Sequence, residues 1–251
     1  MSGVLSDRGI RGLIEAGHVT ADLAVEDGQI QPASLDLRLG ETAYRIRASF
    51  LAGPRRKVSE RLADFAMHEV DLTQGAVLEK GCVYVVPLIE GLDLPMGISG
   101  AASAKSSIGR LDLLTRIITD FGTEFDRVPE GYSGPLYVEI CPRSFSVVAT
   151  TGQMLNQIIF RDGDTVISDR ELAALHAAAP IVSGDAVIKD GLGFSVDLKP
   201  ETGDLVGYRA KPHTGVIDLG RIGHYDPAEY WEELRTDDGF IILDPGAFYI
   251  L

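Results

Sequence analysis

Short apolar runs rich in β-branched residues fill the first 160 positions of this chain, and Gly, Pro or Asp interrupts them every few residues. Runs of this length are typical of strands, and SLDLRL at 34–39 also shows their two-residue alternation. The same pattern predicts strands over 83–88, 134–140, 144–149 and 154–160. A chain built in this way is expected to fold as a mainly β barrel or sandwich.

Three segments predict short helices. One follows Ser6, a second follows Ser59, and the third covers 171–179. The third is the most clearly marked, because a capping box starts at Ser168 and Pro180 stops the helix.

The charge balance limits the partners that the protein can have. The chain carries 37 acidic and 23 basic residues, a formal net charge of -14, which argues against sequence-independent binding to nucleic acid. Cys82 and Cys141 form no metal-ligand spacing, and the N-terminus lacks a signal pattern. No run reaches the roughly 18 apolar residues that span a bilayer. We therefore expect a soluble cytoplasmic protein without a membrane partner.

A weak internal repeat links the two ends of the chain. Residues 194–199 echo 33–38, and residues 243–249 echo 78–84, in the same order and with similar spacing. Chance similarity between β segments is the alternative explanation.

If the repeat is real, the chain divides into three parts. We expect a β-barrel domain over 1–167, a helical linker over 168–180 and a partial second copy of the same fold over 181–251. A fragment of a longer protein or a truncated gene would produce this pattern.

The stretch SAKSSIGRLDLL at 103–114 concentrates hydrogen-bond donors and positive charge in an otherwise anionic chain. Lys105, Ser106, Ser107 and Arg110 lie within six residues, among small neighbours. Turn N–H groups, hydroxyls and cations together suit a phosphate, although the Walker pattern is absent. A solvated turn is the alternative.

Two further polar residues interrupt apolar strands. Glu139 lies in GYSGPLYVEI and is either an edge-strand carboxylate that faces water or a buried charge that needs a partner or a raised pKa. Gln157 lies in TGQMLNQIIF, where its amide could read the edge of a base.

Five segments in order, SDRGIRGLIEAGHV, IQPASLDLRLG, AKSSIGRLDLL, GYSGPLYVEI and TGQMLNQIIF, resemble the deoxycytidine triphosphate deaminases, relatives of the trimeric deoxyuridine triphosphatases. The resemblance covers roughly residues 4–160. It implies a distorted, dUTPase-like β-barrel that assembles as a homo-oligomer, by family likeness a trimer. The implied reaction is hydrolysis of dCTP to dUTP and ammonia, with dCTP and dUTP as the nucleotide ligands.

The resemblance also assigns residues. Glu139 matches the catalytic carboxylate, which takes a proton from the water that attacks C4 of the cytosine ring, while Ser106 and Arg110 hold that water and polarise the site. The nucleotide-binding positions that it implies are Lys105 (usually Arg in the family), Ser107, Ile108, Gly109, Thr119, Asp126, Tyr137, Val138 and Gln157.

The expected chemistry needs no catalytic metal. Zinc deaminases require a His or Cys ligand set with a PCxxC motif, and this sequence has neither. We expect no zinc, and Mg²⁺ only as the charge partner of the triphosphate.

The chain departs from the family pattern in three places. Pro129 occupies the position of a sugar-binding Asp, and the inserted GTEFDR at 122–127 leaves open whether Asp126 replaces it. Thr119, followed by Asp120, stands where a small Ala is usual near the base. After Phe160 no counterpart of the family's closing tail is visible, so closure over the phosphates falls to the second copy or is missing.

Two other functions fit parts of the pattern. A dUTP diphosphatase or a bifunctional deaminase would use an IDxxY-like turn and a Gly-rich arm, whereas this chain has VPEGY at 128–132 and no such arm. Retention of Glu139 favours a deaminase. A non-catalytic nucleotide-binding module is the third possibility.

Overall fold

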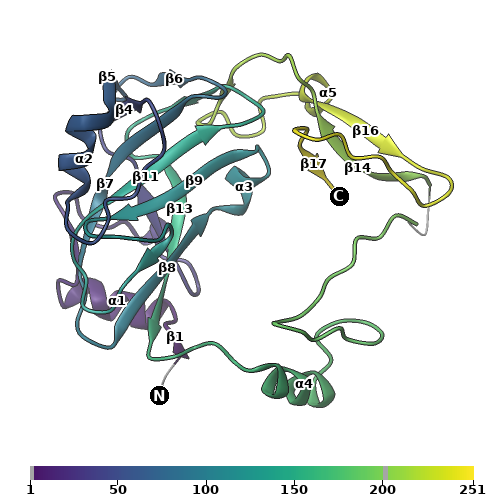
Figure 1. Ribbon diagram of the computed structural model, residues 1–251, viewed down its shortest axis with the longest axis horizontal. Helices are drawn as coiled ribbons and strands as arrows, with labels where there is room; N and C mark the ends of the chain where they lie inside the picture. Colours follow the sequence, from purple (N-terminus) through teal and green to yellow (C-terminus); the bar gives the residue numbers. More distant parts are fainter. Residues whose placement is uncertain (1–2, 200–202) are drawn as a thin grey trace.

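The computed structural model describes residues 3–199 and 203–251, and two large sheets make up its barrel (Figure 1). Side chains from both sheets belong to one apolar core. The five-stranded sheet contains β1 (Gly3–Val4), β13 (Met154–Asp162), β8 (Ile98–Ala104), β10 (Arg127–Val128) and β3 (Leu35–Arg38). The six-stranded sheet contains β5 (Ala66–Asp71), β4 (Thr42–Ile46), β7 (Val83–Asp93), β11 (Ser133–Pro142), β9 (Leu113–Thr119) and β2 (Val19–Ala21). The smaller sheets are β15 (Ile217–Asp218), β12 (Val147–Ala149) and β6 (Ala76–Leu78), and β16 (Trp231–Arg235), β14 (Leu205–Ala210) and β17 (Tyr249–Ile250). The mainly β, distorted barrel expected from the sequence is confirmed.

The helices are short and lie between strands. They are α1 (Asp7–Glu15), the 3₁₀ turn η1 (Asp27–Gln29), α2 (Val58–Phe65), α3 (Ser106–Gly109), α4 (Asp169–Ala178) and α5 (Pro227–Tyr230). The capping box of α4 is present as predicted. Within residues 3–199 and 203–251, no helix combines the length and the apolar character that crossing a membrane requires.

Two predicted boundaries are wrong. Helix α2 begins at Val58 and not after Ser59, because the buried Val58 donates its N–H to a carboxylate oxygen of Asp120 (2.7 Å). Strand β12 begins at Val147 and not at position 144, because the Ser144 hydroxyl donates to Asp112 (2.8 Å) instead of following a strand path.

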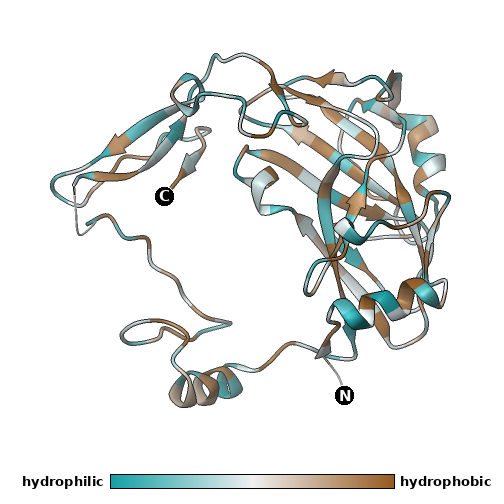
Figure 2. Ribbon diagram, turned by 180° about the vertical axis from the view of Figure 1, so that it is seen from behind, coloured by the Kyte–Doolittle hydropathy of each residue, from teal (hydrophilic) through white to brown (hydrophobic). Residues whose placement is uncertain are grey.

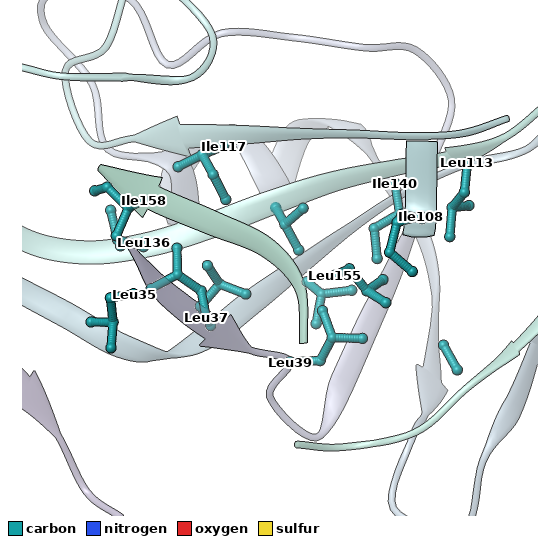
Figure 3. Close-up of a cluster of buried hydrophobic side chains, with 14 of the residues drawn as sticks. Leu35, Leu37, Leu39, Ile108, Leu113, Ile117, Leu136, Ile140, Leu155 and Ile158 are labelled. Carbon is teal, nitrogen blue, oxygen red and sulfur yellow. The ribbon is translucent and has the colours of Figure 1, made fainter. Parts of the chain in front are cut away.

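The centre of the core is built from leucines and isoleucines that alternate along the strands (Figure 3). Leu35, Leu37 and Leu39 are fully buried, and Ile158 and Leu136 from neighbouring strands belong to the same cluster. Burial of each such side chain contributes about 1.5–3 kcal/mol relative to exposure. This core fixes β3, β11 and β13, the strands that carry the candidate residues.

The polar residues that alternate with these leucines on β3 are buried as well. Arg38 donates from Nε to Glu90 Oε1 (2.6 Å) and from its backbone N to Glu90 Oε2 (2.7 Å). Gln29 donates its amide to the same Glu90 (2.8 Å). Because Glu90 is 0% exposed, these donors offset the cost of removing its charge from water. The network locks β3 against β7.

The C-terminal strands pack on the barrel. Strand β15 pairs in parallel with β12, and the Phe145 ring lies 5.8 Å from the Tyr230 ring and 5.4 Å from the Trp231 ring. Ala210, Ile217 and Tyr230 belong to the same core cluster as the barrel leucines. The chain reaches these strands by way of α4, none of whose residues is buried (Figures 1 and 2).

The segment 194–199, whose sequence echoes that of β3, does not form a strand in the described part of the chain. The described residues 194–199 adopt no regular structure, and Phe194 and Val196 are 81% and 56% exposed. Figure 2 shows hydrophobic residues along this extended segment, outside the barrel. Apolar alternation without a buried face or a partner strand does not produce a strand.

The other half of the repeat has a structural counterpart. The order β16–β14–β17 matches β5–β4–β7. Arg45 faces Tyr84 across β4 and β7, and Arg209 faces Tyr249 across β14 and β17. The guanidinium lies 5.6 Å from the tyrosine ring centre in the first unit and 6.0 Å in the second. The two units therefore share strand order, register and stacking.

The turn before each tyrosine is also the same. The tyrosine hydroxyl accepts a hydrogen bond from the backbone N–H five positions earlier, at 3.1 Å in the first unit and 2.9 Å in the second. Gly81 and Gly246 stand at the same place in this turn, with φ of 78° and 81°. A side chain is strained at such positive φ, which explains glycine at both positions.

Candidate functional site

The predicted phosphate cluster forms a tight turn between β8 and β9. Lys105 donates its backbone N–H to Leu155 on β13 (2.9 Å), and its carbonyl accepts from Ile108 (2.9 Å) and Gly109 (3.0 Å). The Ile108 side chain is buried and anchors the turn to the core. The neighbouring hydroxyls and the last cation point outward, because Ser106, Ser107 and Arg110 are exposed. These side chains are available to a ligand.

Lys105 has a partner within the fold. Its ammonium pairs with Asp36 on β3, whose side chain is 1% exposed. The other carboxylate oxygen of Asp36 is buried and has no hydrogen-bond partner among the residues that the structure describes. The charge of Lys105 therefore serves the buried Asp36 first, and Arg110 is the cation of the turn that forms no ion pair among residues 3–199 and 203–251.

A cavity of about 780 Å³ lies beside this turn. Lys105, Ser107 and Leu111 line one side, and Asp218 and Arg221 from the C-terminal part line another. The volume lies within the range of small-molecule sites. Arg221 is 61% exposed, and its Nε lies 3.4 Å from Asp218. The C-terminal part thus brings a second cation near the hydroxyls of α3. Figure 1 shows helix α3 on the side of the barrel toward β17.

Glu139 lies in the middle of the six-stranded sheet, so the edge-strand alternative is wrong. Its strand β11 pairs with β7 on one side and β9 on the other. Glu139 is 2% exposed and stands opposite Arg116 of β9. Arg116 donates to Glu139 Oε1 from Nε (3.2 Å) and from Nη2. The other oxygen, Oε2, is buried and has no hydrogen-bond partner among the described residues. The buried charge is therefore paired through one oxygen only.

Asp126 of the inserted turn lies beside this pair. Its Oδ1 accepts from the backbone N–H of Ile117 (2.7 Å), the neighbour of Arg116 on β9. Burial raises the pKa of Asp126, the Ile117 N–H and Arg116 oppose this, and Glu139 adds to it. The insertion thus places a second carboxylate next to Glu139.

The other predicted residues on these strands divide by face. Tyr137 lies two positions before Glu139, on the same side of β11, and packs in a smaller cluster with Ile46 and Phe50. Val138 points into the main core, and its strand is paired on both sides, with Val86 of β7 and Ile117 of β9 opposite it. Thr119 is 1% exposed, and its hydroxyl is buried without a partner.

Gln157 lies on β13 of the five-stranded sheet. Its amide oxygen accepts from the Ser34 hydroxyl (3.1 Å), and its amide nitrogen lies 3.5 Å from the Ser103 hydroxyl. It therefore belongs with the α3 side of the molecule and not with Glu139.

The predicted residues form two groups within one copy of the chain. Glu139, Asp126 and Tyr137 lie around Arg116, whereas the α3 residues lie beyond the start of β9. The three residues from Arg116 to Leu113 span about 10 Å of strand, and Arg110 lies a further turn away. Within one copy, Glu139 therefore lies about 10 Å of strand or more from the turn that carries Arg110.

Sequence reasoning missed Arg116, Phe125 and Arg221. A signal for Arg116 was present, because LLTRIIT at 113–119 is an apolar strand with one basic residue, just as LYVEI carries one acidic residue. Two lone charges of opposite sign in adjacent strands are expected to pair. Nothing in the sequence alone placed Phe125 or Arg221 near the candidate residues.

Comparison with known proteins identifies the family. The model of the 2'-deoxycytidine 5'-triphosphate deaminase N-terminal domain matches residues 1–164. The chain belongs to this deaminase family. The model of the family's C-terminal domain matches residues 168–251.

Relatives and a solved structure agree with this assignment. The dUMP-forming dCTP deaminase of Parafrankia sp. is 34% identical over 145 residues, which are 55% of this chain and 64% of that protein. That of Corynebacterium glutamicum strain R is 32% identical over 143 residues, covering 55% and 68%. The crystal structure of the deaminase from Agrobacterium tumefaciens superposes with a TM-score of 0.92 at 46% identity, over 99% of this chain and 75% of that one.

Proposed function

We propose that this protein hydrolyses dCTP to dUTP and ammonia, with Glu139 as the general base. The observation that carries the proposal is the state of this carboxylate. Glu139 is almost fully buried, Arg116 holds Oε1, and Oε2 has no hydrogen-bond partner in the described part of the chain. A positioned carboxylate with one free oxygen can accept a proton from water.

In the proposed reaction, Oε2 of Glu139 transfers both protons of the attacking water. The water oxygen adds to C4 of the cytosine ring while Glu139 Oε2 takes a water proton and passes it to N3. The C4–N4 bond then breaks, and Glu139 carries the remaining hydroxyl proton to the leaving amine. The products are a uracil ring with a C4 carbonyl and ammonia. Glu139 ends in its starting state.

We propose that each complete site forms between two copies of the chain, in a homotrimer. The separation of Glu139 from α3 supports this, because Ser106 and Arg110 of a neighbouring copy can then hold the water and polarise the ring. The trimer itself rests on the family resemblance described above.

A complementation experiment tests the shared site. Glu139→Gln and Arg110→Ala should each be inactive alone, and random reassembly of the two variants combines one intact copy of each group in about a quarter of sites. We expect the mixed protein to recover activity in about that proportion. No recovery, with mixed oligomers shown by mass spectrometry, would place the site within one copy.

The cavity beside α3 is our proposed polyphosphate site. Ser107 and the backbone of the turn offer donors, and Arg221 faces them from the C-terminal part, where it would close over the phosphates. Mg²⁺ is held mainly by substrate phosphates in such sites, with one or two carboxylates, and Asp218 is the carboxylate in this cavity. When bound, the ion neutralises part of the phosphate charge.

The second candidate reaction continues to dUMP. The names of the curated relatives from Parafrankia and Corynebacterium favour it, since both are dUMP-forming. Ammonia and pyrophosphate release, measured side by side with dCTP and with dUTP, separates the possibilities. Ammonia alone supports our proposal, both products support the dUMP route, and pyrophosphate from dUTP alone supports a diphosphatase. Release of neither ammonia nor pyrophosphate would support a non-catalytic nucleotide-binding module.

We also propose the domain limits 1–167, 168–180 and 181–251. The repeated strand units and the unburied α4 support them. Trypsin is expected to cut first at Arg170 or Lys189, both exposed, and the fragments should stay associated through the Phe145 contacts. First cuts within the barrel would contradict this division.

A further inference from the structure

The guanidinium of Arg116 is held on several sides. Its carbon lies 3.7 Å from the centre of the Phe125 ring, which is close for a cation–π contact. Nη2 also donates to the Ser49 hydroxyl (3.1 Å). Two of its donors reach the same oxygen of Glu139. An arginine bound in this way has little freedom to leave the carboxylate.

Phe125 is itself fixed by the turn that carries it. The next residue, Asp126, has a positive φ of 61° and binds β9 twice, because its N–H donates to the Ile117 carbonyl (2.9 Å) while Oδ1 accepts from the Ile117 N–H. The Asp126 carbonyl accepts from Ala102 on β8 (2.8 Å). The inserted turn at 122–127 is thus tied to two strands and presents its aromatic ring to Arg116.

We propose that Phe125 and Arg116 are positioning residues, which act in series to hold Glu139 with Oε2 directed at the reacting ring. The proposal rests on the proposed function of Glu139. It explains why only one carboxylate oxygen is tied, since fixing both would leave no acceptor for the water proton. It also gives the insertion a role in catalysis, because the inserted turn supplies Phe125. We call the series Phe125–Arg116–Glu139 the clamp.

A purely structural role makes a different prediction. If Arg116 only neutralises a buried charge, Phe125 matters through the apolar surface that it buries, and a leucine would serve as well. The charged groups around Glu139 are Arg116 on β9 and Asp126 on the turn. The test therefore compares side chains that differ in their π face and keep their apolar bulk.

The experiment measures kcat and KM for dCTP in Phe125→Leu, Phe125→Tyr, Arg116→Ala and Arg116→Lys, with Arg127→Ala as the matched control from the same turn. Within the described residues, the side chain of Arg127 forms an ion pair with the exposed Glu124 and with no other group, and this variant should keep wild-type kcat. Loss of the cation–π contact should lower kcat roughly threefold to tenfold in Phe125→Leu. Phe125→Tyr should retain the wild-type kcat, and KM should change little in both Phe125 variants. Arg116→Ala should lower kcat about a hundredfold, and Arg116→Lys should lower kcat less than Arg116→Ala does.

A double variant tests whether the residues act in series. With Arg116→Ala already present, Phe125→Leu should cause no further loss of kcat. Independent, multiplying losses would overturn the proposal. So would wild-type kcat in Phe125→Leu, or a loss that appears only in KM.

One readout is independent of catalysis. In the unliganded protein, the Nε proton of Arg116 should exchange slowly in NMR spectra and at least severalfold faster in Phe125→Leu. An inactive wild type with this protection intact would overturn the proposed function and leave the clamp standing. Equal exchange in both proteins would overturn the clamp.

Discussion

Lys105 should matter more for stability than for nucleotide binding. Its ammonium is the partner of Asp36, whose side chain is 1% exposed and whose second oxygen is already without a hydrogen bond. Removing one member of a buried pair costs about 3–5 kcal/mol, because the other charge stays buried. Since 27% of the Lys105 side chain is exposed, solvent screens part of this, and we expect Lys105→Met to lose about 2–4 kcal/mol.

Urea unfolding measures this free energy, and the melting temperature should fall by roughly 5–15 °C. The double variant Lys105→Met/Asp36→Asn should recover most of the loss, because no uncompensated charge remains. Lys189→Met removes an exposed lysine and should stay within about 0.5 kcal/mol of wild type. A Lys105→Met protein of wild-type stability that has lost its affinity for dCTP would refute the reasoning and make Lys105 primarily a phosphate ligand.

The remaining predictions concern the triphosphate, metals and Asp126. Arg110→Ala should weaken dCTP binding by roughly 1.5–3 kcal/mol and deoxycytidine binding far less; equal losses by calorimetry would contradict a phosphate role. A zinc-selective chelator should leave ammonia release intact, whereas removing Mg²⁺ should weaken dCTP binding; tightly bound stoichiometric zinc in active protein would contradict this. Burial raises the pKa of Asp126 above 3.8, so its contribution to stability is present at low pH and lost as pH rises through the folded-state value. Asp126→Asn should therefore gain stability relative to wild type between pH 3 and pH 7 in thermal melts, and a constant difference would contradict it.

Local patterns predicted the elements that depend on local chemistry. The capping box at Ser168 marked α4, alternation marked β3, and a short apolar run marked β13. The segment 194–199 echoes the sequence of β3 but forms no strand, because the same alternation has no buried face there. The sequence similarity between 78–84 and 243–249 has a structural basis. In both segments the tyrosine hydroxyl accepts a hydrogen bond from a backbone N–H, and the glycine adopts a positive φ.

The candidate residues were harder to interpret, because their roles depend on register between distant strands. The sequence identified Glu139 as a charge in an apolar strand but left its surroundings open. Only the pairing of β11 with β9 places Arg116 opposite it. Likewise, Lys105 was predicted as a phosphate ligand because the sequence does not show that Asp36 is buried next to it.

The central claim is that Glu139 is the base, and Glu139→Gln tests it most directly. Glutamine keeps the size of the side chain and can still accept a hydrogen bond from Arg116, but it cannot take a proton from water. Ammonia release from dCTP should fall by roughly 10²–10⁴-fold or more, while calorimetry should show dCTP still bound by the folded variant. Turnover at the wild-type rate would contradict the account and move the base elsewhere, with Asp126 as the nearest carboxylate.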